Sequence, residues 1–90
     1  MEALEERIPC TRCLRRGETL AIFFPIDLTV LCCAGRIRIA LEDATAPVHL
    51  AEGERYAARR NVRFTIAFRE GARNEWLADS GIALVALLRA

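Results

Sequence analysis

The feature that most constrains this sequence is an apolar residue at every second position over most of the chain beyond residue 18. The pattern is clearest at 36–42 and 62–68, where aliphatic or aromatic side chains alternate with charged or small ones. Successive side chains of a β-strand point to opposite faces, so this period indicates strands with one buried face. Gly, Pro, Asn or Asp separates the segments. The sequence predicts an all-β fold, a small antiparallel barrel or sandwich of about seven or eight short strands.

A chain of 90 residues has the length of one domain, and residues 1–90 are expected to form a single one. Residues 1–16 are expected to be an N-terminal arm, in which Pro9 ends any helical turn. Residues 17–90 are expected to be the β domain. Strands are expected at 20–24, 26–33, 36–42, 48–50, 56–58, 62–68, 75–78 and 82–88.

The positions expected to face inward share an apolar side chain. They are Leu20, Ile22, Phe24, Leu28, Val30, Cys32, Ile37, Ile39, Leu41, Phe64, Ile66 and Phe68. A small-ligand site needs a few convergent polar groups among its apolar walls. This set therefore predicts a filled core in place of a polar pocket.

The charges of the chain nearly cancel, with 13 basic and 12 acidic residues and a net charge of +1. No global field favours nucleic acid or an anionic membrane, and neither is expected as a partner. The acidic start does not resemble a signal peptide. The longest apolar run, 82–88, is far shorter than the roughly 20 residues of a membrane-spanning helix. A soluble, cytoplasmic protein with reduced cysteines is expected.

Four cysteines and one histidine are the residues most often used for metal or redox chemistry. Cys10 and Cys13 form a CxxC, which leaves three interpretations open: unreactive thiols, zinc ligands, or a redox or disulfide pair. Cys32 and Cys33 are adjacent in an expected strand and so face opposite sides, with Cys32 in the core. His49 is expected to face outward. It could serve as a fourth zinc ligand, but one histidine excludes a multi-histidine metal centre.

Four arginines are candidate anion-binding residues. Arg36 and Arg38 point outward on one expected strand, while Arg55 and Arg63 flank a nearby turn. Guanidinium groups suit carboxylate and phosphate, which they bind with two parallel hydrogen bonds. The alternative is a solvated strand face beside the acidic residues of the same region.

Three expected strand segments are apolar on both faces, which a small single-layer shell cannot bury by itself. Their outward positions form a candidate interface: Ala21, Phe23, Leu31, Cys33, Val85 and Leu87. An exposed apolar patch of this size usually marks an interaction site. The pattern predicts a homo-oligomer, most simply a dimer, with residues 1–16 as the alternative cover.

The stretch from Leu14 to Leu88 resembles a bacterial family of short, uncharacterised cupin-like domains. The resemblance rests on the segments 17–20 (GETL), 34–39 (AGRIRI) and 50–54 (LAEGE). It implies a cupin-like barrel and no assigned activity.

Metal-binding cupins hold their ion with histidines and a carboxylate at fixed offsets from two motif glycines. Anchored on Gly35 and Gly53, those offsets all carry apolar residues here: Ile22, Phe24, Leu28 and Phe64. A longer spacing in the first motif substitutes Ala21 and Phe23, which are no better as ligands. The resemblance therefore implies a cupin-like protein with no metal and no cofactor.

These observations favour a non-catalytic domain that acts through self-association or through a protein partner. The alternative is a metal-free sensor domain or enzyme that binds a small anionic ligand.

Overall fold

The computed structural model describes residues 8–69 and 81–90. These residues form eight β-strands: β1 (Cys10–Arg15), β2 (Thr19–Ile22), β3 (Leu28–Ala34), β4 (Arg36–Leu41), β5 (Val48–Ala51), β6 (Arg55–Ala58), β7 (Phe64–Phe68) and β8 (Ile82–Arg89). The predicted all-β fold is confirmed. The strand expected at 75–78 lies outside the described residues. Within the described ranges there is no helix long and apolar enough to cross a membrane.

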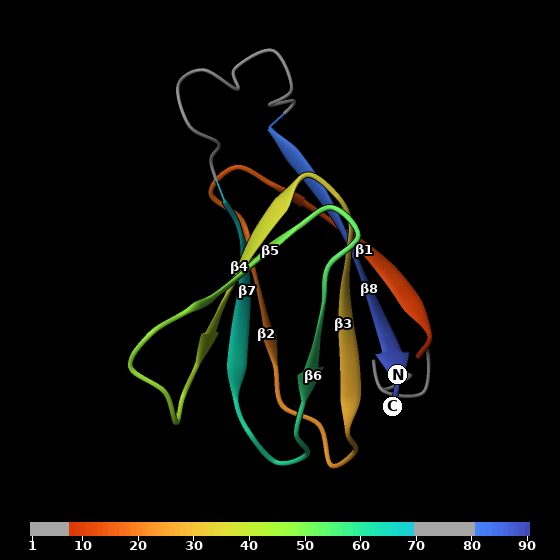
Figure 1. Cartoon of the computed structure of the whole chain (residues 1–90), viewed down its shortest axis with the longest axis vertical. Helices are drawn as coiled ribbons and strands as arrows, with labels where there is room; N and C mark the ends of the chain where they lie inside the picture. The colour runs from red at the N-terminus through yellow and green to blue at the C-terminus, as the bar shows by residue number, and fades with distance from the viewer. Residues whose placement is uncertain (1–7, 70–80) are drawn as a thin grey trace.

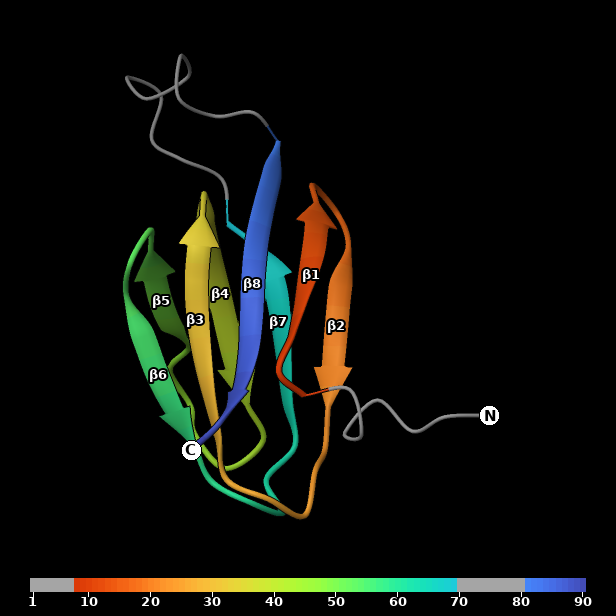
Figure 2. The ribbon, with the colours of Figure 1, turned by 90° about the vertical axis from the view of Figure 1, so that its right-hand side faces the viewer.

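The strands form two four-stranded antiparallel sheets that lie face to face (Figures 1 and 2). Sheet A has the order β1-β8-β3-β6, and sheet B has the order β2-β7-β4-β5. The chain passes repeatedly from one sheet to the other, so most hydrogen-bonded neighbours are distant in sequence. Each strand consequently has one face toward the opposite sheet and one face away from it.

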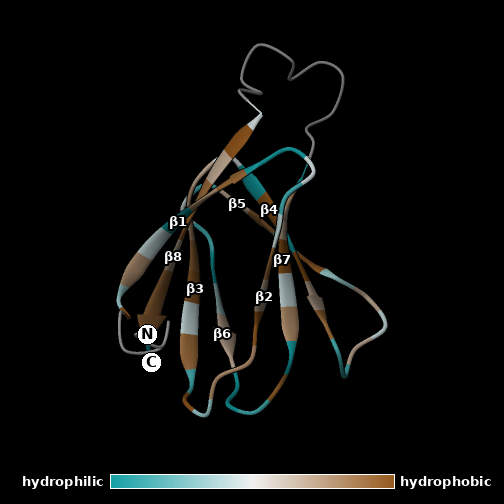
Figure 3. Cartoon of the chain, turned by 180° about the vertical axis from the view of Figure 1, so that it is seen from behind, coloured by the Kyte–Doolittle hydropathy of each residue, from teal (hydrophilic) through white to brown (hydrophobic). Residues whose placement is uncertain are grey.

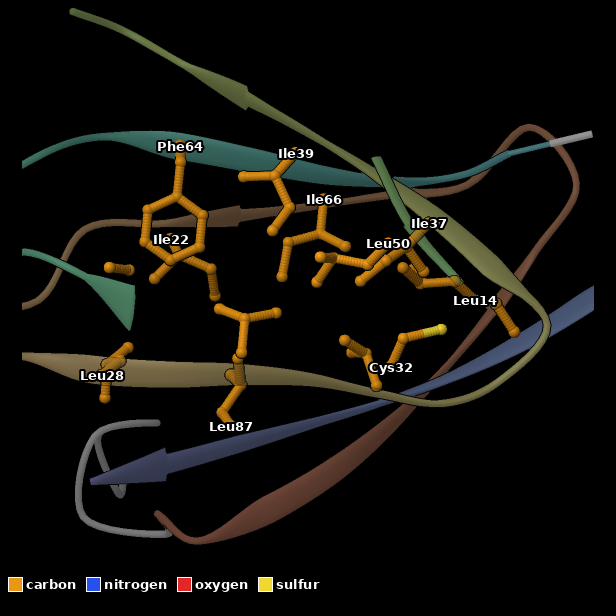
Figure 4. Close-up of a cluster of buried hydrophobic side chains, with 14 of the residues drawn as sticks. Leu14, Ile22, Leu28, Cys32, Ile37, Ile39, Leu50, Phe64, Ile66 and Leu87 are labelled. Carbon is orange, nitrogen blue, oxygen red and sulfur yellow. The ribbon is translucent and has the colours of Figure 1, made fainter. Parts of the chain in front are cut away.

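The inner faces of the two sheets meet in one apolar core (Figure 4). Its most deeply buried large side chains are Leu28, Val30, Cys32, Ile37, Ile39, Ile66, Val85 and Leu87. Every position expected to face inward lies in this core or packs against it, which confirms the predicted alternation. Among the described residues, no polar or charged side chain is buried.

Part of the segment expected to be an N-terminal arm is a strand of sheet A. β1 pairs with β8 along its whole length, from Cys10 opposite Leu87 to Arg15 opposite Ile82. Leu14 is buried on its inner face. The sequence did not predict this strand because only one of its inner residues is a large aliphatic one. The alternation of apolar and polar side chains is therefore not visible in this segment.

The phase of β8 differs from the expected one. Val85 and Leu87 were expected at an interface, but both are fully buried in the core. The outward positions include Ile82 and Leu84, which are 41% and 37% exposed. A strand that is apolar on both faces carries no alternation from which its phase can be derived.

Gly35 forms the turn that carries the chain from β3 in sheet A to β4 in sheet B. Its φ of 74° lies in the left-handed region, which side chains other than glycine disfavour. A Cβ at this position would lie 2.7 Å from the carbonyl oxygen of Ile82 and 3.1 Å from the Cα of Ala83. The turn therefore needs glycine both for its conformation and for its close approach to β8.

We expect Gly35→Ala to destabilise the fold more than Gly53→Ala. Both glycines have positive φ, so each alanine costs about 1–2 kcal/mol of backbone strain. A Cβ at Gly53 would meet nothing within 4 Å, whereas at Gly35 it would collide with β8 backbone. The free energies of unfolding from urea titrations measure the difference. Equal losses would show that β8 moves away from the turn at no cost.

Candidate functional site

The positions that the cupin resemblance aligns with metal ligands lie at one end of the core (Figure 4). Ile22 on β2 pairs directly with Phe64 on β7, and Leu28 extends toward them from sheet A. All three are at least 95% buried, and Phe24 packs against the same cluster. Hydrocarbon fills the space in which a polar ligand set would stand.

An ion pair and backbone hydrogen bonds join the loop after β2 to the turn after β6 at this end of the core. The backbone N–H of Arg60 donates to Oδ1 of Asp27 at 2.8 Å, and the Arg60 guanidinium lies 3.4 Å from the same carboxylate. The N–H of Asn61 donates to the carbonyl oxygen of Phe24 at 2.8 Å. A surface pocket of about 260 Å³ lies here, lined by Pro25, Ile26, Asp27, Arg60, Arg89 and Ala90.

The pairing with Arg60 also affects the acidity of Asp27. The Arg60 side-chain hydrogen bonds, followed by its backbone N–H, lower the pKa of Asp27 below its ordinary value. A carboxyl with a lowered folded-state pKa stabilises the fold above its unfolded pKa. That contribution is lost as pH falls through the folded-state pKa.

We expect Asp27→Asn to lower stability at pH 7 and to have little effect at pH 2. Asn keeps an oxygen that can accept the Arg60 N–H bond, so the variant removes mainly the charge. The unfolded aspartate titrates at about 3.9, so the difference between the two proteins should shrink below that pH. Urea titrations at both pH values test this. A difference that persists unchanged at pH 2 would rule out the charge as its cause.

Phe64 is the largest side chain at this end of the core, and we expect Phe64→Ala to cost about 3–5 kcal/mol of unfolding free energy. Phe23→Ala is the matched control, because the same side chain is 49% exposed there and should cost much less. Equal denaturation midpoints for the two variants would contradict the burial of Phe64.

The structure does not bring the four candidate anion-binding arginines together. Arg36 and Arg38 lie on the outer face of sheet B, whereas Arg55 pairs with Leu31 in sheet A. Arg63 directly precedes β7 at the far end of sheet B. Its guanidinium lies 4.0 Å from Glu42 and over the ring of Phe23. Six residues of strand, about 20 Å, separate Arg36 from that end.

A different basic group lies on the outer face of sheet B. Arg38 pairs with His49 on β5 and with Ala67 on β7. Arg69 follows β7 two residues beyond Ala67, and its N–H donates to the carbonyl oxygen of Arg36. His49 is exposed as predicted. Arg69 and His49 were not grouped with Arg38 because only the cross-strand register places them beside it.

The cysteines do not form a common site. Cys10 packs against the core, while Cys13 is exposed on the opposite face of β1. Three residues of strand span about 10 Å, and disulfides need Cα atoms within about 7 Å, so the CxxC geometry does not support a disulfide. Burial raises the pKa of the Cys32 thiol, and Cys33 is exposed. Among the described residues, no cluster of three or more His, Cys, Asp and Glu side chains suits a metal ion.

The outer face of sheet A is largely apolar. The register places twelve side chains there: Thr11, Cys13, Arg15, Thr29, Leu31, Cys33, Arg55, Ala57, Ile82, Leu84, Ala86 and Leu88. Its two arginines lie on the edge strands β1 and β6. Figure 2 faces this side of the molecule. In Figure 3, β8, a central strand of sheet A, is coloured hydrophobic over most of its length. The two exposed cysteines are both on this face.

No known protein-family profile and no curated protein matches the sequence. Solved structures do match the fold. A cupin protein with a double-stranded β-helix fold from Methanocaldococcus jannaschii is 20% identical, with a TM-score of 0.67 over 88% of this chain and 65% of that one. The cupin domain of Drosophila melanogaster CENP-C is 13% identical, with a TM-score of 0.69 over 99% of this chain and 65% of that one.

A third similar structure, a protein of unknown function from Acidithiobacillus ferrooxidans, is 15% identical, with a TM-score of 0.61 over 83% of this chain and 59% of that one. This chain therefore spans about three fifths to two thirds of the length of these proteins. The fold is a cupin-like double-stranded β-helix.

Proposed function

We propose that the protein is a non-catalytic cupin-like domain that forms a homodimer through the outer face of sheet A. The interior supports the non-catalytic part, because the described residues bury no polar or charged side chain that could bind a substrate. The proposed interface keeps Leu31 and Cys33 of the predicted set and replaces Val85 and Leu87 with their outward neighbours on β8. Ala21 and Phe23, also predicted at the interface, belong to the sheet B side of the molecule and are left out.

The observation that carries the proposal is the composition of β8. Its sequence, IALVALLR, is apolar at seven successive positions. A run of this kind is typical of a strand covered on both faces, yet a single chain covers only one. Leu84 is 37% exposed on β8, which is a central strand of sheet A. Apolar surface of this kind is stabilised when a second apolar surface covers it.

Three further properties of the face fit a second copy of the chain. The large side chains of Leu31 and Leu84 stand beside the small ones of Ala57 and Ala86, so projections and hollows are both present for self-complementary packing. The central strands contribute no charged side chain to the face, so a two-fold contact buries no like charges. Cysteine is among the most buried residue types, and covering this face would bury Cys13 and Cys33.

Protein binding by a cupin fold has a precedent in the similar structures. Drosophila melanogaster CENP-C, 13% identical to this chain with a TM-score of 0.71 over 99% of it, was solved bound to CAL1. That structure supports protein–protein contact as a use of this fold.

We expect the intact chain to be a dimer at tens of micromolar and Leu84→Glu to be a folded monomer. Each dimer would bury two like charges near its centre, which costs several kcal/mol. Phe23→Glu, on the outer face of sheet B, is the matched control and should remain a dimer. Sedimentation velocity measures all three, and circular dichroism checks their folding. A monomeric wild type would refute the proposal, and dissociation by Phe23→Glu alone would place the interface on sheet B.

A further inference from the structure

The outer face of sheet B differs from that of sheet A in its charge. None of the eight strands in the described part of the chain contains an acidic residue, and their charged residues are all arginine. On sheet B the outward positions between these arginines are small, including Ala40, Ala51 and Ala67. The arginine side chains of this face are thus flanked by small side chains.

Three basic residues of this face have no ionic partner among residues 8–69 and 81–90. The side chains of Arg38, His49 and Arg69 make no ion pair or hydrogen bond within the described part of the chain. Arg36 lies on the same face and has interactions of its own. The nearby carboxylate of Glu54 accepts the N–H of Ala51 at 2.6 Å, within the turn that follows β5.

The spacing of these groups suits an extended chain. Arg38 and His49 are opposite each other on neighbouring strands, about 5 Å apart at their Cα atoms. Arg69 lies diagonally from Arg38, about 7–8 Å away. Alternate residues of an extended peptide are separated by about 6.6 Å and point to the same side. That repeat lies between the two separations, so carboxylates at alternate positions of such a peptide can pair with the guanidinium groups of Arg38 and Arg69 and accept an N–H from His49.

We propose that the outer face of sheet B, around Arg38, His49 and Arg69, binds an acidic segment of a protein partner. Guanidinium groups bind carboxylates with paired, charge-assisted hydrogen bonds, which supply the attraction. The outer face of a sheet presents its charged groups side by side, which suits an extended chain better than a small free anion. Single-stranded nucleic acid is disfavoured because binding it relies on stacking aromatics. The exposed aromatic of this sheet, Phe23, lies at the far end beneath Arg63.

The test is fluorescence anisotropy with a fluorescein-labelled decaglutamate peptide. We expect saturable binding that weakens when NaCl is raised from 50 to 300 mM, because salt screens exposed charges. Arg38→Glu should weaken binding by about tenfold or more, since it replaces an attraction with a repulsion. Arg59→Glu, the same charge change in the turn after β6, is the matched control and should alter the affinity less than twofold.

Three results would overturn the proposal: no binding of decaglutamate, equal weakening by the two variants, or tighter binding of a labelled ten-residue oligothymidine. Circular dichroism of Arg38→Glu checks that the variant is folded. The monomeric Leu84→Glu chain should bind the peptide at each site as the wild type does, because its substitution lies on sheet A. Failure of this proposal and failure of the dimer are therefore separate outcomes.

Discussion

Branched aliphatic side chains from sheet B pack against valine and leucine from sheet A in a single core layer, and every other feature of the molecule depends on that contact. Ile37, Ile39 and Ile66 contribute from one side, with Val30, Val85 and Leu87 from the other, all fully buried. A core of this composition is dry and closely packed. It fixes which face of each strand is turned away from it, and therefore which side chains remain for interactions with other molecules.

The two outer faces differ in the side chains that they present to the surroundings. Sheet A places leucine, isoleucine, alanine and cysteine outward from its central strands, which favours the exclusion of water by a second apolar surface. Sheet B places arginine and histidine outward on a floor of alanine, which favours an acidic partner in a solvated contact. Among the described residues the interior buries no polar or charged side chain, so both proposals rest on the outer faces.

The sequence predicted the strands whose two faces differ in polarity. In β4 the isoleucines alternate with arginines, and in β7 Phe64 and Ile66 alternate with small residues, so both phases were correct. In β8 both faces are apolar, and Val85 and Leu87 were placed on the wrong one. In β1 the inner row is cysteine, arginine and leucine, which has no recognisable period.

The grouping of surface residues was harder to predict for a different reason. Arg38 lies beside Ala67 and His49 because of strand pairings between distant parts of the chain. Alternation within one strand determines a face but not the neighbours across it. Arg36, Arg38, Arg55 and Arg63 are close in sequence, yet the crossing of the chain between sheets at the β5–β6 turn puts Arg55 on the opposite side of the molecule.

The relative placement of the two faces has a consequence for binding strength. Sheets A and B pack face to face, so their outer faces lie on opposite sides of the molecule. A dimer formed through the outer face of sheet A therefore turns its two basic faces outward in opposite directions. Each face then binds independently, and the dimer presents two equivalent sites without any change in conformation. A partner with two acidic segments joined by a linker long enough to reach both faces would bind the second site at the effective concentration that the linker sets. The apolar face would thereby raise the avidity of the basic one, although the two share no residue.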